Sequence, residues 1–326
     1  MRVAPEEDDR VIALVVAVVL LVVGAALLTA GAEAFAENVS SASSRLGVSV
    51  LAMALLIAGA EPEEAVTATL ASGQGHPALA AGDAIGANLV ILTLTLGLAA
   101  LVTRLPVGDR ALQYALASAV LGGVAWLMLL NGVLGRGEGA VLVVLYVAGV
   151  VLVWRREKEP PMIGEMTELE GREETATDEA TGRALLLLLL GVLGMVVGGA
   201  LAVRGAEGLV DAVGLGESVV GLTVLALATS AEMVALVWAA GRRGLTDVVV
   251  AGTVGAVAYN ATVSLGLAAL VSPLGLGRHN PVTVVAALTA VLPLVLLLRR
   301  GGVLPKPVGA VLVVAYVAAI ALLFAR

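Results

Sequence analysis

Three glutamates stand in a stretch that is otherwise apolar. Glu61, Glu63 and Glu64 surround Pro62 in "AGAEPEEAVTA", which follows "VSVLAMALLI" and leads into a second apolar run. An acidic residue at the centre of a membrane-spanning helix costs about 2.5–3.5 kcal/mol on insertion scales, so it faces a cavity or a partner. The chemistry that such carboxylates offer inside a membrane is the binding of cations.

A fourth glutamate occupies the corresponding place in the second half of the chain. "LGVSVLAMALLIAGAEPEEAV" (46–66) aligns without a gap on "LGESVVGLTVLALATSAEMVA" (215–235), so that Glu63 falls on Glu232. At the same offset "IGANLVILTLTLGLAALV" (85–102) falls on "VGAVAYNATVSLGLAALV" (254–271), and the closing "LGLAALV" is identical. One offset that holds from 46 to 102 indicates an internal duplication.

Two carboxylates that approach each other repel unless cations or protons lie between them. Such a pair suits one divalent ion, or two or more monovalent ions, protons included. Calcium takes 6–8 oxygen ligands. Further oxygens could come from Thr229 and Ser230 beside Glu232, from Asn260 and Thr262 in the next apolar run, and from backbone carbonyls freed by local unwinding at 58–60 and 226–228.

Composition sets the class of protein that must position these residues. The chain is 60% hydrophobic and only 14% charged, with a mean hydropathy of +1.03. Soluble domains are about a quarter charged, so the chain is an integral membrane protein. It has no cysteine, which excludes disulfides and thiol catalysis. His76 and His279 fall in expected loops, and no hydrolase set of residues lies in the apolar runs, so we expect no enzyme and no cofactor.

The apolar runs predict an all-α polytopic membrane protein with ten transmembrane helices in two inverted five-helix repeats. The spans fall near 10–31, 46–71, 78–103, 110–134, 139–155, 184–204, 216–241, 246–271, 282–299 and 307–325. The first repeat is 1–155, an acidic linker is 156–183, and the second repeat is 184–326. Five spans per copy make the two copies enter the membrane from opposite sides, which is a plan of many secondary transporters. Pro62 predicts a broken second helix, and "ATSAE", which lacks a proline, predicts a milder break.

The basic residues predict the orientation in the cell membrane. With the N-terminus outside, the cytoplasmic loops hold most of the basic residues. These are Arg45, Arg104, Arg110, Arg155, Arg156, Lys158, Arg172, Arg183, Arg242, Arg243, Arg299, Arg300 and Lys306. The other side holds only Arg2, Arg10, Arg136, Arg204, Arg278 and Arg326. The positive-inside rule therefore favours both termini outside and the acidic linker in the cytoplasm.

"GLTVLALATSAEMVAL" followed by "GAVAYNATVSLG" resembles the alpha-repeat of the cation/calcium exchanger superfamily, which includes sodium/calcium exchangers and calcium/proton antiporters. The first half carries the same pattern in "GVSVLAMALLIAGAEPEEAV" and "GDAIGANLVILTLTLG". The resemblance implies a secondary active antiporter that exchanges calcium for sodium or protons by alternating access. It also implies that Glu63 and Glu232 are central ion ligands, together with Asn260, Thr229 and Ser230.

The first repeat departs from the pattern of that superfamily. Ile91 stands at the position that matches Asn260, and Gly59 and Ala60 replace small polar residues. The proline before Glu63 is typical of the sodium-coupled branch, whereas "ATSAE" is closer to the proton-coupled branch. The two halves therefore favour different coupling ions. We expect Ile91 to lie beside the ion site.

Several acids and amides leave alternatives open. Glu61 and Glu64 could replace the missing ligands or could line an aqueous vestibule, and the vestibule is the favoured interpretation; we nonetheless include Glu61 among the metal ligands. Asp83 is expected to cap the start of its helix rather than to bind an ion. Asn88 and Asn131 are expected to form hydrogen bonds between helices.

The alternative functions are a degenerate exchanger that moves sodium or protons without calcium or has lost transport, and a cation channel. Inverted repeats with broken helices favour the exchanger over the channel. We expect cations and the lipid bilayer as partners, and no nucleic acid. The sequence leaves the oligomeric state open.

Overall fold

The computed structural model describes residues 7–46, 61–157, 178–231, 233–234, 246–299 and 302–325. In the first half the helices are α1 (Glu7–Leu46), α3 (Pro62–Gly73), α4 (Pro77–Leu89), the π-helix η1 (Val90–Thr95), α5 (Leu96–Val102), α6 (Asp109–Leu129) and α7 (Arg136–Glu157). In the second half they are α9 (Asp178–Val213), α10 (Glu217–Val220), the π-helix η2 (Gly221–Leu225), α11 (Ala226–Thr229), α13 (Thr246–Tyr259), the π-helix η3 (Asn260–Ser264), α14 (Leu265–Val271), α15 (Pro281–Val291), the 3₁₀-helix η4 (Leu292–Arg299) and α16 (Lys306–Phe324). Most of the predicted linker lies outside the described residues.

The described helices follow the predicted spans. Seven of them are long and apolar enough to cross a membrane, and the segments Glu217–Thr229 and Pro281–Leu296 are shorter apolar helices. The fold is all-α and polytopic, with ten helices in two inverted repeats. The predicted bounds of two helices were wrong: α1 continues to Leu46 instead of ending near 31, and α9 runs from Asp178 to Val213 instead of from 184 to 204. Hydropathy marks where a helix enters lipid, and both helices continue past that point into polar sequence.

Two very short β-ladders show how the halves are related. Strand β1 (Leu105–Pro106) pairs antiparallel with β4 (Val303–Leu304), and β2 (Val133–Leu134) pairs antiparallel with β3 (Leu274–Gly275). In the alignment of the repeats, β1 corresponds to β3 and β2 corresponds to β4. Each ladder therefore joins one half to the other, and exchanging the halves converts one ladder into the other. This is the twofold relation that the duplication predicted.

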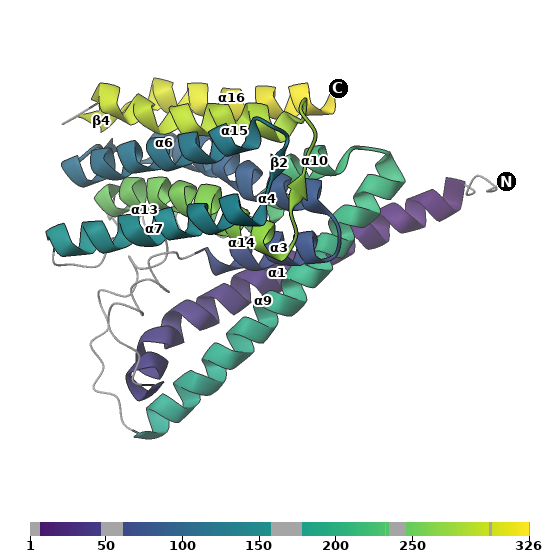
Figure 1. Cartoon of the computed structure of the whole chain (residues 1–326), viewed down its shortest axis with the longest axis horizontal. Helices are drawn as coiled ribbons and strands as arrows, with labels where there is room; N and C mark the ends of the chain where they lie inside the picture. The colour runs from purple at the N-terminus through teal and green to yellow at the C-terminus, as the bar shows by residue number, and fades with distance from the viewer. Residues whose placement is uncertain are drawn as a thin grey trace.

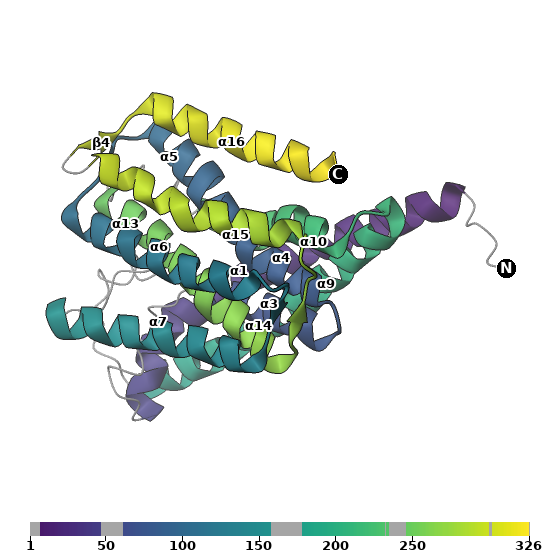
Figure 2. The same ribbon diagram turned by 45° about the horizontal axis from the view of Figure 1, so that its top comes forward.

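The long helices α1 and α9 form a closely packed pair. Figure 1 shows them side by side, at an angle to the stack of α16, α15, α6, α13 and α7. A side chain on Gly198 would lie 2.7 Å from the carbonyl oxygen of Gly24, and one on Gly31 would lie 2.7 Å from that of Gly191. Small residues let helix backbones approach this closely in membranes. Figure 2 shows a second such contact, where α16 lies beside α5 and Gly309 meets Gly97.

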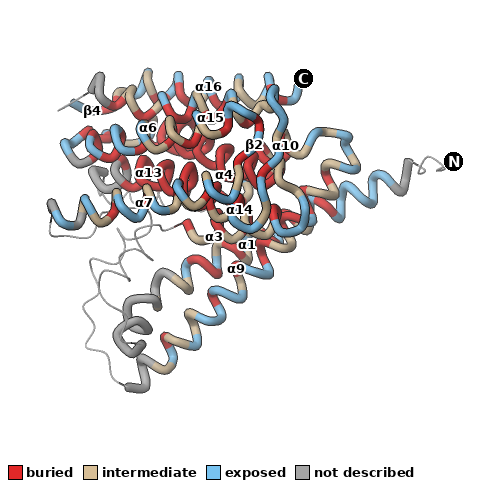
Figure 3. Tube along the Cα trace, in the orientation of Figure 1, coloured by how far each residue is buried: buried red, intermediate tan, exposed pale blue. Residues whose placement is uncertain are grey.

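Burial separates central helices from lipid-facing ones. In the spans Pro77–Val102 and Gly252–Val271, 78% of the most apolar window is buried, compared with 22% for Arg10–Phe35 and Lys306–Phe324. Figure 3 shows this contrast as red inner helices and pale outer faces. The two central spans carry the π-helices η1 and η3 at matching positions. They form the core against which α3 and α11 are held.

The α1–α9 crossing yields a stability prediction. We expect Gly198→Ala to destabilise the protein by about 1–3 kcal/mol, because the added methyl group would meet backbone atoms that cannot move aside. The matched control is Gly149→Ala in α7, where a side chain would have no neighbour within 4 Å. Thermal unfolding of the purified variants measures the effect. Equal unfolding temperatures for both variants would contradict the close crossing.

Candidate functional site

The first-half glutamates lie at the start of a helix, as Pro62 predicted. Helix α3 begins at Pro62, with Glu61 as its N-cap and Glu63 and Glu64 in its first turn. All three are buried, with exposed fractions of 3%, 6% and 0%. The N-terminus of a helix favours negative charge, because its free N–H groups and dipole point at the carboxylates. Residues 58–60, where unwinding was predicted, lie outside the described residues.

The matching segment of the second half has a milder irregularity. Residues 226–228 are α-helical within α11, so the unwinding predicted there is wrong. The distortion falls at Ser230 instead, which leaves helical geometry with φ −81° and ψ 5°. The Val234 amide still reaches the Ser230 carbonyl oxygen at 3.4 Å. Glu232 lies outside the described residues, so its pairing with Glu63 stays a prediction.

Polar side chains of the two halves meet in three buried hydrogen bonds. The Ser230 hydroxyl donates to Oε1 of Glu64 at 2.8 Å. The neighbouring Thr229 hydroxyl donates to Oδ1 of Asp83 at 3.2 Å. The Asn260 amide donates to Oε2 of Glu61 at 2.6 Å. In each bond the first half supplies the acid and the second half supplies the neutral donor. We call Glu61, Glu63, Glu64 and Asp83 the acid cluster.

Two members of the acid cluster were assigned wrongly from the sequence. Asp83 lies in the second turn of α4, which begins at Pro77, and is fully buried, so it does not cap the helix. Glu64 is fully buried as well, so it does not line an open vestibule. Among the described residues, Oε2 of Glu64 and Oδ2 of Asp83 have no hydrogen-bond partner. The sequence feature that could have indicated a buried role for Asp83 is its position as an acid inside the otherwise apolar "PALAAGDAIGANL".

The predictions for the remaining residues of the site region have different outcomes. Asn88 donates to the Val257 carbonyl oxygen at 3.1 Å, which confirms a hydrogen bond between helices. Asn131 instead accepts from the Val133 amide in its own turn, so that prediction is wrong. Thr262 donates to the Ala258 carbonyl oxygen of its own helix. Ile91 is fully buried in η1, and its place beside the ion site stays a prediction.

Known proteins resemble this chain over most of its length. A family described as sodium/calcium exchanger protein matches residues 11–155 and 183–325. The chain belongs to the sodium/calcium exchanger protein family. Inner membrane protein YrbG of Escherichia coli K12 is 30% identical over 228 residues, which are 69% of this exchanger and 70% of YrbG. The putative antiporter CaxA of Alkalimonas amylolytica is 26% identical over 288 residues, which are 86% and 90% of the two chains.

Solved structures share the fold of this exchanger. The sodium-calcium exchanger NCX_Mj, soaked with 2.5 mM Na⁺ and 1 mM Sr²⁺, superposes with a TM-score of 0.62 at 22% identity. The match covers 94% of this chain and 98% of that chain. The family membership confirms three predictions from the sequence: the superfamily, a cation antiporter, and a transporter rather than an enzyme.

The buried carboxylates of the acid cluster of this exchanger need positive charge to neutralise them. Among the residues whose burial the structure describes, no lysine, arginine or histidine is buried. Buried carboxylates that lack a basic partner cost several kcal/mol each, unless cations or protons neutralise them. No three acidic or histidine side chains of the described part converge tightly enough to hold a metal by themselves. Other oxygens, such as hydroxyl, amide and carbonyl groups, are therefore needed to complete a cation site.

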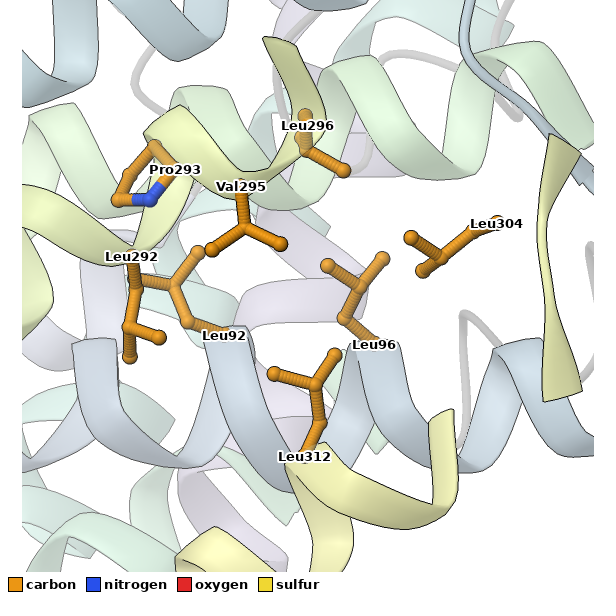
Figure 4. Close-up of a pocket in the computed structure, with 8 residues that line it drawn as sticks. All are labelled: Leu92, Leu96, Leu292, Pro293, Val295, Leu296, Leu304 and Leu312. Carbon is orange, nitrogen blue, oxygen red and sulfur yellow. The ribbon is translucent and has the colours of Figure 1, made fainter. Parts of the chain in front are cut away.

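Two small hollows between described helices lie away from the acid cluster. One of about 10 Å³ lies between η1, α5, η4, β4 and α16, and Figure 4 shows its lining of leucine and valine side chains together with Pro293. Another of about 60 Å³ lies between α6, α7 and α13, where Tyr114 and Tyr146 are among its lining residues. Neither hollow reaches a carboxylate of the acid cluster. The acid cluster is enclosed by protein in this conformation.

The buried charges yield a second prediction. We expect Asp83→Asn to raise the unfolding temperature in cation-free buffer by several degrees, roughly 2–3 kcal/mol, because the amide keeps the Thr229 contact and removes an uncompensated charge. Cations should then stabilise the variant less than the wild type. The matched control is Asp211→Asn on the exposed side of α9, which should change neither value. Thermal unfolding with and without calcium and sodium is the measurement, and an unchanged Asp83→Asn profile would contradict the prediction.

Proposed function

We propose that this exchanger moves calcium in exchange for sodium or protons by alternating access, with Glu63 and Glu232 as its central ligands. The observation that carries the proposal is the set of buried hydrogen bonds between first-half acids and second-half hydroxyl and amide groups. No basic residue is buried among those with a described exposure. Carboxylate, amide and hydroxyl oxygens are the ligands that calcium takes in proteins. Family membership supports the same assignment.

The proposed ligands include one that compensates for a departure from the family pattern. In the second half Asn260 supplies an amide, and in the first half Ile91 stands at the matching position. The hydrogen bond between Asn260 and Glu61 supports Glu61 as the source of the oxygen that Ile91 lacks. The full proposed set is Glu63, Glu232, Asn260, Thr229, Ser230 and Glu61.

Glu64 and Asp83 add negative charge beside this set. They hold the hydroxyl groups of Ser230 and Thr229, which are proposed ligands. With both of them ionised, the acids of the first half alone carry more charge than one calcium ion neutralises. We therefore propose that more than one cation or proton occupies the site during the cycle, as exchange with sodium or protons requires.

A second candidate is exchange of sodium or protons without calcium. Ile91 and Ala60, which stand in the first half where the second half has Asn260 and Thr229, favour it, because they reduce the number of neutral oxygen ligands. A divalent ion needs more oxygens than these few ligands provide, unless Glu61 contributes. Calcium uptake into vesicles under imposed sodium or pH gradients distinguishes the two candidates.

The central glutamates yield the third prediction. Glu63→Gln and Glu232→Gln should each reduce calcium exchange by about a hundredfold or more, because each removes a charge and a ligand while keeping the shape. The double variant should be little worse, since the two residues act as one unit. The matched control is Glu33→Gln, an exposed glutamate of α1. Exchange is measured in vesicles, and near-normal exchange by the Glu232→Gln protein would contradict the proposal that Glu232 is a central ligand.

The orientation yields the fourth prediction. We propose that both termini lie outside and that the linker is cytoplasmic, because of the excess of basic residues in the loops on the linker side. The natural chain has no cysteine, so single cysteines at Arg156, Glu174 and Arg2 can be labelled with an impermeant thiol reagent. In intact cells only the Arg2 position should react. Labelling of Glu174→Cys from outside would reverse the orientation.

A further inference from the structure

A histidine lies between two carboxylates at one end of the helix stack, away from the acid cluster. His76 occupies the turn between α3 and α4 and caps the start of α4. Its Nδ1 atom is 3.0 Å from Oε1 of Glu217, and its Nε2 atom is 3.3 Å from Oε1 of Glu207. The three side chains are partly exposed. We call this group the His76 clasp.

The geometry of the clasp depends on the charge of the imidazole ring. A neutral imidazole carries a hydrogen on only one of its two nitrogens, and the other nitrogen presents a lone pair. Each nitrogen of His76 faces a carboxylate oxygen, which can only accept. Both contacts are therefore hydrogen bonds only when the ring is protonated. In the neutral ring one lone pair opposes a carboxylate, and that contact is lost.

The clasp joins three elements that position both halves of the cation site. His76 ends the segment that begins with the glutamates of α3, about 18 Å along the helix at 1.5 Å per residue. Glu217 begins α10, which continues through η2 into α11 and its Thr229. Glu207 belongs to α9, the partner of α1. Movement of any of these elements against the others must break a contact of the clasp.

Other charged groups near the clasp lie on its own elements and on one neighbouring loop. On α9, Arg204 and Asp211 lie about one turn on either side of Glu207. Arg278 and His279 lie in the exposed turn before α15. That turn is tied to α10 because the Asn280 amide donates to the Ser218 hydroxyl at 2.7 Å. The described residues show no ion pair between His76 and these four groups.

We propose that the His76 clasp is a proton-sensitive brake on exchange. The protonated ring binds α9 and α10 to the α3–α4 turn and stabilises the closed arrangement in which the acid cluster is enclosed. The neutral ring releases one of the two carboxylates. Both contacts need a hydrogen on each ring nitrogen, so this stabilisation is present with the charged ring and is lost with the neutral ring. Alternating access requires these elements to move, so a proton on His76 slows the cycle.

The test changes the pH only on the clasp side of vesicles that hold the full-length protein. Lowering it from about 8 to about 5.5 should slow wild-type exchange by roughly two- to fivefold more than it slows His76→Gln, as expected for two partly exposed ion pairs. His76→Arg keeps a permanent positive charge, so it should be slow at both pH values. The matched control is His279→Gln, which removes the only other histidine, on a loop tied to the same elements. It should keep the wild-type profile.

A second measurement does not need transport. The unfolding temperature of purified wild-type protein should exceed that of His76→Gln at about pH 5.5 and should equal it at about pH 8. Glu217→Gln should reduce the same difference, because it removes one of the two charges. A pH-independent gap between wild type and His76→Gln, or equal pH profiles of exchange, would overturn the clasp. Absence of calcium exchange in the wild type would overturn the proposed function alone, since the unfolding measurement still reports on the clasp.

Discussion

Carboxylates buried inside a membrane protein are the constraint on which the rest of this structure depends. Four acids of the first half are enclosed, and no basic residue is buried among those whose exposure the structure describes. The fold lowers their cost with three devices: the N-terminus of α3, the hydroxyl groups of Thr229 and Ser230, and the amide of Asn260. Neutral donors reduce the cost of a charge but do not cancel it. The balance can be supplied by cations or protons, which is consistent with membership of a cation exchanger family.

The scaffold obeys the twofold relation more closely than the site does. The two β-ladders exchange under the repeat, and so do the contacts of Gly97 with Gly309 and of Gly266 with Gly139. The three described hydrogen bonds between the halves are not symmetric, because in each of them the first half supplies the acid and the second half supplies the neutral donor. Each close helix crossing needs its own small residues, so both copies of the repeat must keep glycines at their crossings. A cation responds only to the sum of the oxygens and charges around it, so the two halves are free to contribute different groups.

Sequence reasoning predicted the spans and the duplication, because both depend on patterns that extend over many residues. It failed where one residue's surroundings decide its role. In the alignment of the repeats Glu63 matches an acid, Glu232, whereas Glu64 matches Met233. The repeat therefore predicted Glu63 as a ligand and gave no such indication for the neighbouring Glu64. Asp83 matches Gly252 and lacked a counterpart in the same way, although its burial within α4 is complete. The π-helices and the two-residue strands were also not predicted from the sequence, because hydropathy does not distinguish one backbone hydrogen-bond pattern from another.

The π-helices explain how matched positions can serve such different side chains. Ile91 lies in η1 and Asn260 begins η3, each in the middle of a nearly fully buried span. A π-turn closes its hydrogen bond one residue further along than an α-turn, and such turns are frequent at functional sites. In η3 the amide of Asn260 bonds Glu61, and in η1 the matched position is occupied by the buried hydrocarbon side chain of Ile91. Because the acid cluster is buried, any cation that binds there can enter or leave only when the surrounding helices move, so binding would be coupled to the conformation of the scaffold.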